Sequence, residues 1–339
     1  MSRYVGVDLH KNMFVASFYD ADVGEHQLGK FGLKDIPKFK RQLKKTDILG
    51  VECTTNTRYF VEQIEQTVDS VKVVNPSQFR VISRSVKKTD ENDARVIAEF
   101  LSKDMIPEVR LKDKRLSELS SLAHTRDKLV KLRTALKNKI HNILSAYGIV
   151  LKKEQLSSDK ALDKVLDFRV SETARIELEV MVAQIKNLNE GIKKLDSELE
   201  NRGKDLPGHK NITSIKGIGN KSGTVLLCAI GNINDFESEK KLASYFGIVP
   251  RVSNSNETMH QGRITKHGNK LARTTLVQCT LVAIRYSPYL RAFYDRIKAK
   301  KGSGKAIIAT SKKLLGIIYQ TLKNNWVFED FPNFVLKSA

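Results

Sequence analysis

The first hundred residues alternate between short apolar runs and polar turns. Four runs are short and rich in β-formers, and they lie at residues 3–8, 13–19, 26–32 and 47–53. The first three are too closely spaced for intervening helices, which predicts an antiparallel meander. Helical periodicity follows at 35–44 and 57–69, and a further strand at 71–76 is ended by Pro76. The pattern predicts a mixed sheet with helices packed on it for residues 1–105.

From about residue 114 the pattern changes to long helices laced with charge. One helix has apolar residues at alternating three- and four-residue steps over three heptads: Leu178, Met181, Ile185, Leu188, Ile192, Leu195 and Leu199. An earlier helix has a comparable stripe: Leu129, Leu132, Leu136, Ile140, Ile143 and Tyr147. With an irregular connection around 150–160, the two helices are expected to form an antiparallel pair. The stripes fit intramolecular packing and a dimerisation arm equally well, because such a seam does not show whose helix it meets.

A linker follows the second long helix. Gly203, Pro207 and Gly208 interrupt the helical pattern, and the sequence beyond them is mainly helical. The chain is therefore expected to be α/β followed by all-α, with three segments at 1–112, 113–203 and 204–339.

A glycine turn opens the last segment. The sequence SIKGIGNKSG places Gly217 and Gly219 between two apolar helical stretches. In a helix–hairpin–helix, such a turn lets backbone N–H groups approach a phosphate. A lone pair of glycines is more often a simple turn, but the flanking Lys216 and Lys221 make phosphate contact an equally good interpretation.

The charge of the chain indicates a polyanionic partner. The net charge is +21 and the pI is about 9.7, so nucleic acid is the first expectation and an anionic membrane the second. Residues 204–339 hold 22 Lys and Arg against 8 Asp and Glu, a net of +14. The last segment is therefore the main candidate for contact with a nucleic-acid backbone.

Other features of the composition exclude several classes of protein. No run of 18 apolar residues occurs, and the start MSRYVGVDLHK has no signal-peptide core, which predicts a soluble, cytoplasmic protein. Cys53, Cys228 and Cys279 lie far apart without CxxC spacing, which argues against a disulfide framework and a zinc site. KKGSGKA at 300–306 lacks the phosphate-loop spacing and follows a basic helical stretch, so it does not indicate ATP binding.

Four carboxylates occur in an order that suggests a metal site. Asp8 ends the first strand, on the face opposite Val5 and Val7, and Glu52 ends the strand ILGVE. Parallel neighbouring strands would bring these two to one edge of the sheet. Asp90 and Asp93 open a helix three residues apart and project from one face. Such a set could hold two divalent cations about 3.5–4 Å apart, as in phosphoryl transfer.

Each of these carboxylates also has a structural explanation. Asp90 is a good N-cap, and Asp93 favours the positive end of the helix dipole. Asp8 and Glu52 could be ordinary residues at strand ends. Their order along the chain argues for catalysis more strongly than any single residue does.

A polar stretch in the last segment raises a second question. RVSNSNETMHQGRITKHGNKLAR at 251–273 gathers Ser253, Ser255 and Thr258 among cations. It is either a solvated connection between helices or a loop that carries a nucleophile.

These motifs together resemble one family. GVDLHK, the GVE strand, NPSQ and KKTDENDARVIAEFL are similar to the RuvC-like, ribonuclease-H-fold domain of DEDD transposases encoded by bacterial insertion sequences. SIKGIG, DFESEKKLASYFGIVP and GRITKHGNKLAR resemble the transposase domain of the same family. The motifs occur in order around a coiled-coil middle, so the resemblance covers nearly the whole chain.

The resemblance implies a site-specific DNA recombinase that cuts and rejoins DNA, in a bacterial cytoplasm, associated with the nucleoid and with no membrane partner. It implies Asp8, Glu52, Asp90 and Asp93 as catalytic metal ligands for two Mg²⁺ ions, with Mn²⁺ as an alternative. It further implies guidance by a structured non-coding RNA and a homo-oligomer, a dimer or tetramer. In that assembly, a serine of one subunit acts beside the carboxylates of another and becomes linked to DNA.

The serine that the resemblance implies is Ser255. The family has a Ser-Gly pair upstream of G-x-I-x-K-x-G-N, and here Asn256 replaces the glycine. Asparagine tolerates positive φ better than other non-glycine residues, so the turn is compatible with it. Ser253 remains an alternative nucleophile.

The surrounding residues suggest how such a serine would react. No Ser-His-Asp order is evident, so metal ions are the expected activators. Arg263, Lys266 and Arg273 are expected to bind the scissile phosphate. His260 and His267 could donate a proton to the leaving oxygen, but histidines in a basic loop more often contact phosphate or have no role in the reaction.

Two other functions fit parts of the sequence. A metal-dependent nuclease or Holliday-junction resolvase would use the carboxylates with water as the nucleophile, and would leave the serine loop unexplained. A non-catalytic nucleic-acid-binding protein would also leave the order of the carboxylates unexplained.

Overall fold

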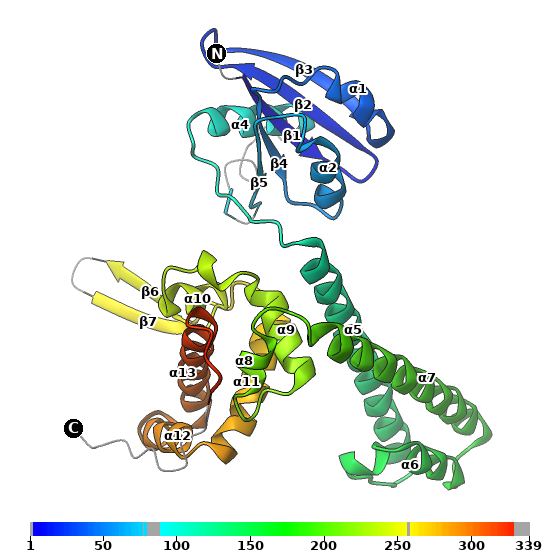
Figure 1. Cartoon of the computed structure of the whole chain (residues 1–339). Coiled ribbons are helices and arrows are strands. Elements are labelled where there is room, and N and C mark those ends of the chain that lie inside the picture. Colours follow the sequence, from blue (N-terminus) through cyan, green and yellow to red (C-terminus); the bar gives the residue numbers. More distant parts are fainter. Residues whose placement is uncertain (1–2, 77, 80–88, 256–257, 329–339) are drawn as a thin grey trace. The chain divides into compact units, whose positions relative to one another are not determined.

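The computed structural model describes residues 3–76, 78–79, 89–255 and 258–328 (Figure 1). The chain divides into two compact units, residues 1–112 and 113–339, and each is described by itself. None of the helices in these described ranges is long and apolar enough to cross a membrane.

The first unit is built on a five-stranded mixed sheet. Its strands are β1 (Arg3–Leu9), β2 (Met13–Asp20), β3 (Glu25–Gly32), β4 (Ile48–Glu52) and β5 (Ser70–Val74). The order in the sheet is β3-β2-β1-β4-β5. β1, β2 and β3 form an antiparallel meander, whereas β4 and β5 run parallel to β1. The mixed, ribonuclease-H-like sheet predicted from the sequence is confirmed.

One face of this sheet carries an aromatic core. Short helices cover it: η1 (Leu33–Asp35), α1 (Ile36–Lys40) and α2 (Thr57–Ile64). Val5 and Val7 of β1 belong to this core. Phe14 stacks on Phe31 with ring centres 5.3 Å apart and meets Phe39 edge to face. The alternation along β1 therefore leaves Gly6 and Asp8 for the opposite face.

The opposite face is covered by α4 (Asp90–Ser102), shown in Figure 1. Gly6 and Gly50 are partners across β1 and β4. A Cβ at Gly6 would clash with the backbone of Ala94 and Ala98, and one at Gly50 would lie 2.9 Å from Cγ2 of Ile97. Two adjacent glycines thus let α4 lie directly on the strands that carry Asp8 and Glu52.

The second unit begins with a long helical hairpin. It consists of α5 (Lys114–Ala146) and α7 (Glu172–Gly203), joined through η2 (Lys153–Leu156), α6 (Asp159–Asp163) and η3 (Lys164–Asp167). The helices are antiparallel, because Arg126 pairs with Asp196 whereas Lys139 pairs with Glu177. Five of the seven residues in the stripe predicted on α7 are buried within the chain: Leu178, Met181, Ile185, Ile192 and Leu199. Intramolecular packing therefore accounts for most of this stripe.

The remaining helices share one core with the base of that hairpin. They are α8 (His209–Thr213), α9 (Asn220–Ile230), α10 (Glu239–Tyr245), α11 (Lys270–Tyr286), α12 (Pro288–Lys301) and α13 (Ser303–Lys323), with η4 (Ile233–Asp235) before α10. Leu119 of α5 and Leu199 of α7 pack into the same core as Leu276 of α11 and Leu314 of α13. The C-terminal helices and the base of the hairpin therefore form one structural unit.

The polar stretch in this unit is a β-hairpin, which corrects the expectation of a loop between two helices. β6 (Pro250–Ser255) pairs antiparallel with β7 (Thr258–Ile264). Its exposed residues include Val252, Gly262 and Arg263. These strands are hard to recognise from the sequence, because they do not show the apolar alternation of a strand packed on a core.

Replacing Gly6 with alanine is expected to lift α4 from β1. The new Cβ would meet backbone atoms of Ala94 and Ala98 that cannot rotate away, and such overpacking lowers the free energy of unfolding by about 1–3 kcal/mol or more. Hydrogen exchange in β1 and α4 measures the loss.

The matched control is Gly304→Ala near the start of α13, where a Cβ meets nothing within 4 Å. There alanine is expected to be neutral or stabilising by up to about 1 kcal/mol. Equal effects of the two changes would contradict the close approach of α4.

Candidate active site

Three elements of the first unit bring the predicted carboxylates together. Val7 and Val51 are partners across parallel β1 and β4, so Asp8 and Glu52 follow side by side at the strand ends. Asp90 and Asp93 lie in the first turn of α4, whose start is fixed by Thr89, which accepts a hydrogen bond from the amide of Asn92 at 3.2 Å. The sheet edge and the helix start therefore form one acidic site.

Burial and mutual repulsion set the electrostatics of this site. Asp8 is 3% exposed and Asp93 is 6% exposed. Burial raises the pKa of Asp8 to about 6; Glu52, Asp90 and Asp93 raise it further by repulsion, while His10 opposes them. Without a cation, the protein holds two buried carboxylates, Asp8 and Asp93, close to the more exposed Glu52 and Asp90, and this concentration of negative charge is unfavourable. Such a cluster favours binding of a positive ion.

His10 is a member of the site that was not singled out from the sequence. Its Nε2 lies 3.2 Å from Oδ2 of Asp8 and 3.3 Å from Oδ1 of Asp90. The backbone carbonyl of His10 accepts a hydrogen bond from Nδ2 of Asn56 at 2.9 Å, which joins the loops after β1 and β4. The available signal was its place two residues after Asp8 in GVDLHK.

The donor atoms fit a divalent metal ion. One ligand atom each from Asp8, His10 and Asp90 lies within 4.8 Å of the other two. Carboxylate oxygens suit Mg²⁺, and an imidazole nitrogen also suits Mn²⁺ and other transition metals. These residues can therefore supply ligands from β1, the loop after it and α4.

The serine candidates lie on the hairpin of the second unit. Ser255 is the last residue of β6 and pairs with Thr258, while Ser253 pairs with His260. Asn256 and residue 257, at the tip of the β-hairpin, lie outside the described residues, as do the side chains of residues 253–261. The choice between Ser255 and Ser253 therefore remains a prediction.

The base of the hairpin is fixed by the GRITKHGN motif. Gly268 has φ 82° and Gly247 has φ 66°, and each approaches backbone too closely for any side chain. Nη1 of Arg273 donates hydrogen bonds to the carbonyl oxygens of Phe246 at 3.0 Å and His267 at 3.1 Å. The structure thus places Arg273 as a brace for the turn, in addition to its predicted phosphate contact.

Arg263 and Lys266 differ from Arg273, because both are exposed. Lys266 has φ 57° in the turn after β7, where the chain leaves the hairpin for α11. His267, in the same turn, is also exposed. These positions are compatible with contact to a phosphate.

The glycine turn between α8 and α9 is explained largely by packing. Gly217 has φ 106°, and a Cβ there would lie 2.7 Å from the amide nitrogen of Ala283 in α11. Nζ of Lys221 is 3.0 Å from Oδ2 of Asp196 on α7. Gly219 caps α9 and has open space around its Cβ position. Lys216 lies in the same turn. Because the space around Gly219 is open, the start of α9 is accessible.

Comparison with known proteins gives matches over both units. The family described as "Transposase IS116/IS110/IS902 family" matches residues 209–295, and a DEDD-type family described as "Transposase" matches residues 5–149. Together the two matches cover more than half of the chain. The chain belongs to the IS110/IS1111 family of transposases.

Individual relatives agree with this assignment. The transposase for insertion sequence element IS1111A of Coxiella burnetii is 28% identical over 262 residues, covering 74% of this chain and 71% of the relative. A probable family 20 transposase of Pseudomonas aeruginosa is 22% identical, covering 83% and 84%. The pilin gene-inverting protein of Moraxella bovis is 27% identical, covering 96% and 97%.

As an IS110/IS1111 transposase, the protein is a DNA-processing enzyme with a metal-dependent DEDD domain. The expectation of a DNA partner is therefore confirmed in its general form.

Proposed function

We propose that this transposase is a site-specific recombinase in which the acidic site of one subunit acts with Ser255 of another. The observation that carries the proposal is the convergence of Asp8, Glu52, Asp90 and Asp93 at one edge of the sheet, where Asp8 and Asp93 are buried. Such a cluster is unfavourable unless a cation neutralises it, and two-metal carboxylate sites perform phosphoryl transfer. We assign the cations as two Mg²⁺ ions, with Mn²⁺ as a substitute.

The protein residues have separate tasks in this reaction. Bound Mg²⁺ supplies charge neutralisation at the attacking and leaving oxygens. The oxygen of Ser255 attacks the scissile phosphorus and loses its proton, the Oγ–P bond forms, and the P–O bond to the leaving strand breaks. The leaving oxygen takes up a proton. Arg263 and Lys266 hold the phosphate and offset its developing charge.

Rejoining reverses this chemistry with a new strand. A free hydroxyl of another DNA end attacks the phosphoserine, restores the phosphodiester and releases Ser255. The bond energy is kept in the covalent intermediate, so no ATP is needed. A pilin gene-inverting protein among the relatives supports recombination over simple cleavage, because inversion requires that ends be rejoined.

We further propose that a structured RNA guides the enzyme and that it acts as a dimer or tetramer. The surplus of 22 basic over 8 acidic residues in 204–339 supports binding to nucleic-acid backbones. The proposed contacts with the nucleic-acid backbone, in addition to those of the β-hairpin, are Lys216, the glycine turn at Gly217 and Gly219, and Lys221. Pairing with an RNA would supply sequence choice without direct reading of bases.

The test combines the purified protein, its co-isolated nucleic acid, DNA carrying the ends of its element, and Mg²⁺. Joined DNA products and a protein–DNA adduct that survives denaturation are expected, together with a single structured RNA on sequencing. Cleavage that leaves only free ends, with no adduct at any time, would instead indicate a nuclease that uses water. Random co-isolated fragments would contradict RNA guidance.

A further inference from the structure

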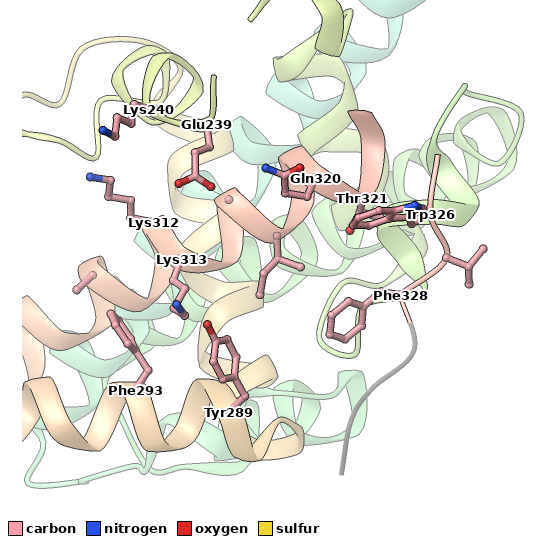
Figure 2. Close-up of a pocket in the computed structure, with 14 residues that line it drawn as sticks. Glu239, Lys240, Tyr289, Phe293, Lys312, Lys313, Gln320, Thr321, Trp326 and Phe328 are labelled. Atoms are coloured by element: carbon pink, nitrogen blue, oxygen red, sulfur yellow. The ribbon is translucent and has the colours of Figure 1, made fainter. Parts of the chain in front are cut away.

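A groove on the C-terminal helices has an unusual combination of aromatic and basic side chains (Figure 2). It encloses about 730 Å³, within the roughly 300–1,000 Å³ typical of small-ligand sites. Its floor is one face of α13, and its walls come from α10 and α12. The segment at 326–328 closes one end. We call it the α13 groove.

The floor is kept low by a glycine. Gly316 lies between Lys312 and Gln320 on the exposed face of α13, at four-residue steps. A Cβ at Gly316 would lie 2.7 Å from Oε2 of Glu239, so the carboxylate of α10 reaches directly over the helix backbone. A larger residue at this position would fill the groove.

The aromatic wall of the groove contacts a cation of the same chain. Nζ of Lys313 lies 4.7 Å from the ring centre of Tyr289 and 5.0 Å from that of Phe293. At the closed end, Trp326 is 58% exposed. Half-buried rings beside an ammonium group, with an exposed tryptophan at one end, match a ligand with a flat apolar part and attached negative charge.

The basic residues continue beyond the groove. Lys240 and Lys312 are exposed, and Figure 2 shows both ammonium ends pointing away from Glu239. Lys305, also exposed, lies seven residues before Lys312 and hence on the same side of α13. A phosphate backbone leaving the groove in that direction would meet successive cations.

We propose that the α13 groove binds an unpaired nucleotide of a nucleic-acid strand. Its base lies against Tyr289, Phe293 or Trp326, and its phosphates meet Lys240 and Lys312. A paired base cannot present its face in this way, because it is stacked within the duplex.

Polar groups in the groove can bind the edge of that base. The carboxylate of Glu239 accepts a hydrogen bond from an exocyclic amino group, as acidic side chains do with cytosine. Gln320, on the floor, offers an amide beside it (Figure 2). The groove therefore combines a stacking surface, a base-edge contact and a phosphate contact.

The chain supplies its own probe, because Trp326 is its only tryptophan. Metal-free protein is titrated with a ten-nucleotide single strand, as RNA and as DNA, and with a blunt duplex of the same length. Saturable quenching of Trp326 by either single strand, and weaker quenching by the duplex, supports the proposal. The RNA and DNA arms show which strand the groove prefers. Quenching by the duplex as strong as by the single strands would overturn the proposal. A change in Trp326 fluorescence that depends on the protein concentration and not on the added strand would overturn it as well.

Variants distinguish binding in the α13 groove from general electrostatic attraction to the basic surface. Phe293→Ala is expected to weaken single-strand binding by about 5- to 150-fold, the usual effect of losing one stacking partner. Its matched control is Tyr286→Ala, which removes an aromatic that is 58% exposed on α11 outside the groove lining and should leave binding unchanged.

Because Phe293 is half-buried, the exposed Lys312→Gln gives a second measurement that does not depend on packing. It should weaken binding and make its salt dependence shallower by about one phosphate contact. Unchanged affinity in both variants would overturn the proposal. The readout uses no metal and no cleavage, so it is independent of the recombinase proposal.

Discussion

Asp8→Asn is expected to abolish DNA cleavage and, in metal-free protein, to stabilise the first unit. The activity loss follows because a metal ligand is removed. The several kcal/mol of charge stabilisation that a bound metal supplies correspond to a fall of at least about 10³-fold in rate. Strand cleavage under saturating Mg²⁺ measures this effect.

The stability gain follows from the charge that Asp8 buries. Its pKa is about 6 in the folded state, against 3.8 for the ordinary carboxyl. The folded protein therefore binds more protons between these values, so the stability of the metal-free enzyme falls as pH rises from about 4 to about 6. The accumulated loss at pH 7.5 is about 3 kcal/mol. The amide introduced by Asp8→Asn carries no charge, so the variant should regain up to that amount at pH 7.5 and gain nothing at pH 4.

Mg²⁺ should reverse the order of the two proteins. It stabilises the wild type by binding only the folded site, whereas Asp8→Asn gains little. Hydrogen exchange at the amides of β1 follows the first unit specifically. Asp47→Asn is the matched control, since Asp47 is also fully buried but pairs with Arg3 at 2.7 Å. Asp47→Asn should lower the free energy of unfolding of the first unit at neutral pH. A metal-free Asp8→Asn protein less stable than wild type would contradict the repulsive cluster.

The acidic site could be anticipated because its geometry follows from local rules. Alternation along β1 determines which face Asp8 occupies, and parallel pairing brings Glu52 to the same edge. The spacing of Asp90 and Asp93 determines their common face on α4. The role of Gly6 was not evident from the sequence, because the glycine is required by a helix that packs on β1 and lies about ninety residues later in the chain.

Features that depend on distant partners were not predictable in the same way. The ion pair of Lys221 with Asp196 could not be predicted, because it depends on how α7 packs beside α9. Gly217 allows contact with α11, more than sixty residues further along. The hairpin was missed because its residues do not show the alternation of a strand on a core. In each case, the decisive contact is absent from the local sequence pattern.

Ser255→Ala is expected to eliminate the denaturation-resistant adduct and all joined products. The change removes only a hydroxyl at the end of β6, so the acidic site in the other unit should bind Mg²⁺ as before. Gel mobility of labelled DNA after denaturation measures the adduct, and Mg²⁺ titration of the same preparation checks the acidic site. Ser253→Ala, two residues earlier on the same strand, is the matched control and should keep the adduct.

The pair of variants also separates the three functions that the sequence left open. Loss of the adduct in Ser253→Ala alone would move the nucleophile to Ser253 and leave the recombinase mechanism intact. Equal, metal-dependent cleavage by both variants without any adduct would show that water is the nucleophile, as in a resolvase. A protein that only binds nucleic acid would cleave in neither case and would be indifferent to Asp8→Asn. The mechanism therefore requires that one hydroxyl of the hairpin and the carboxylates of the sheet edge each be necessary, although they lie in different units of the chain.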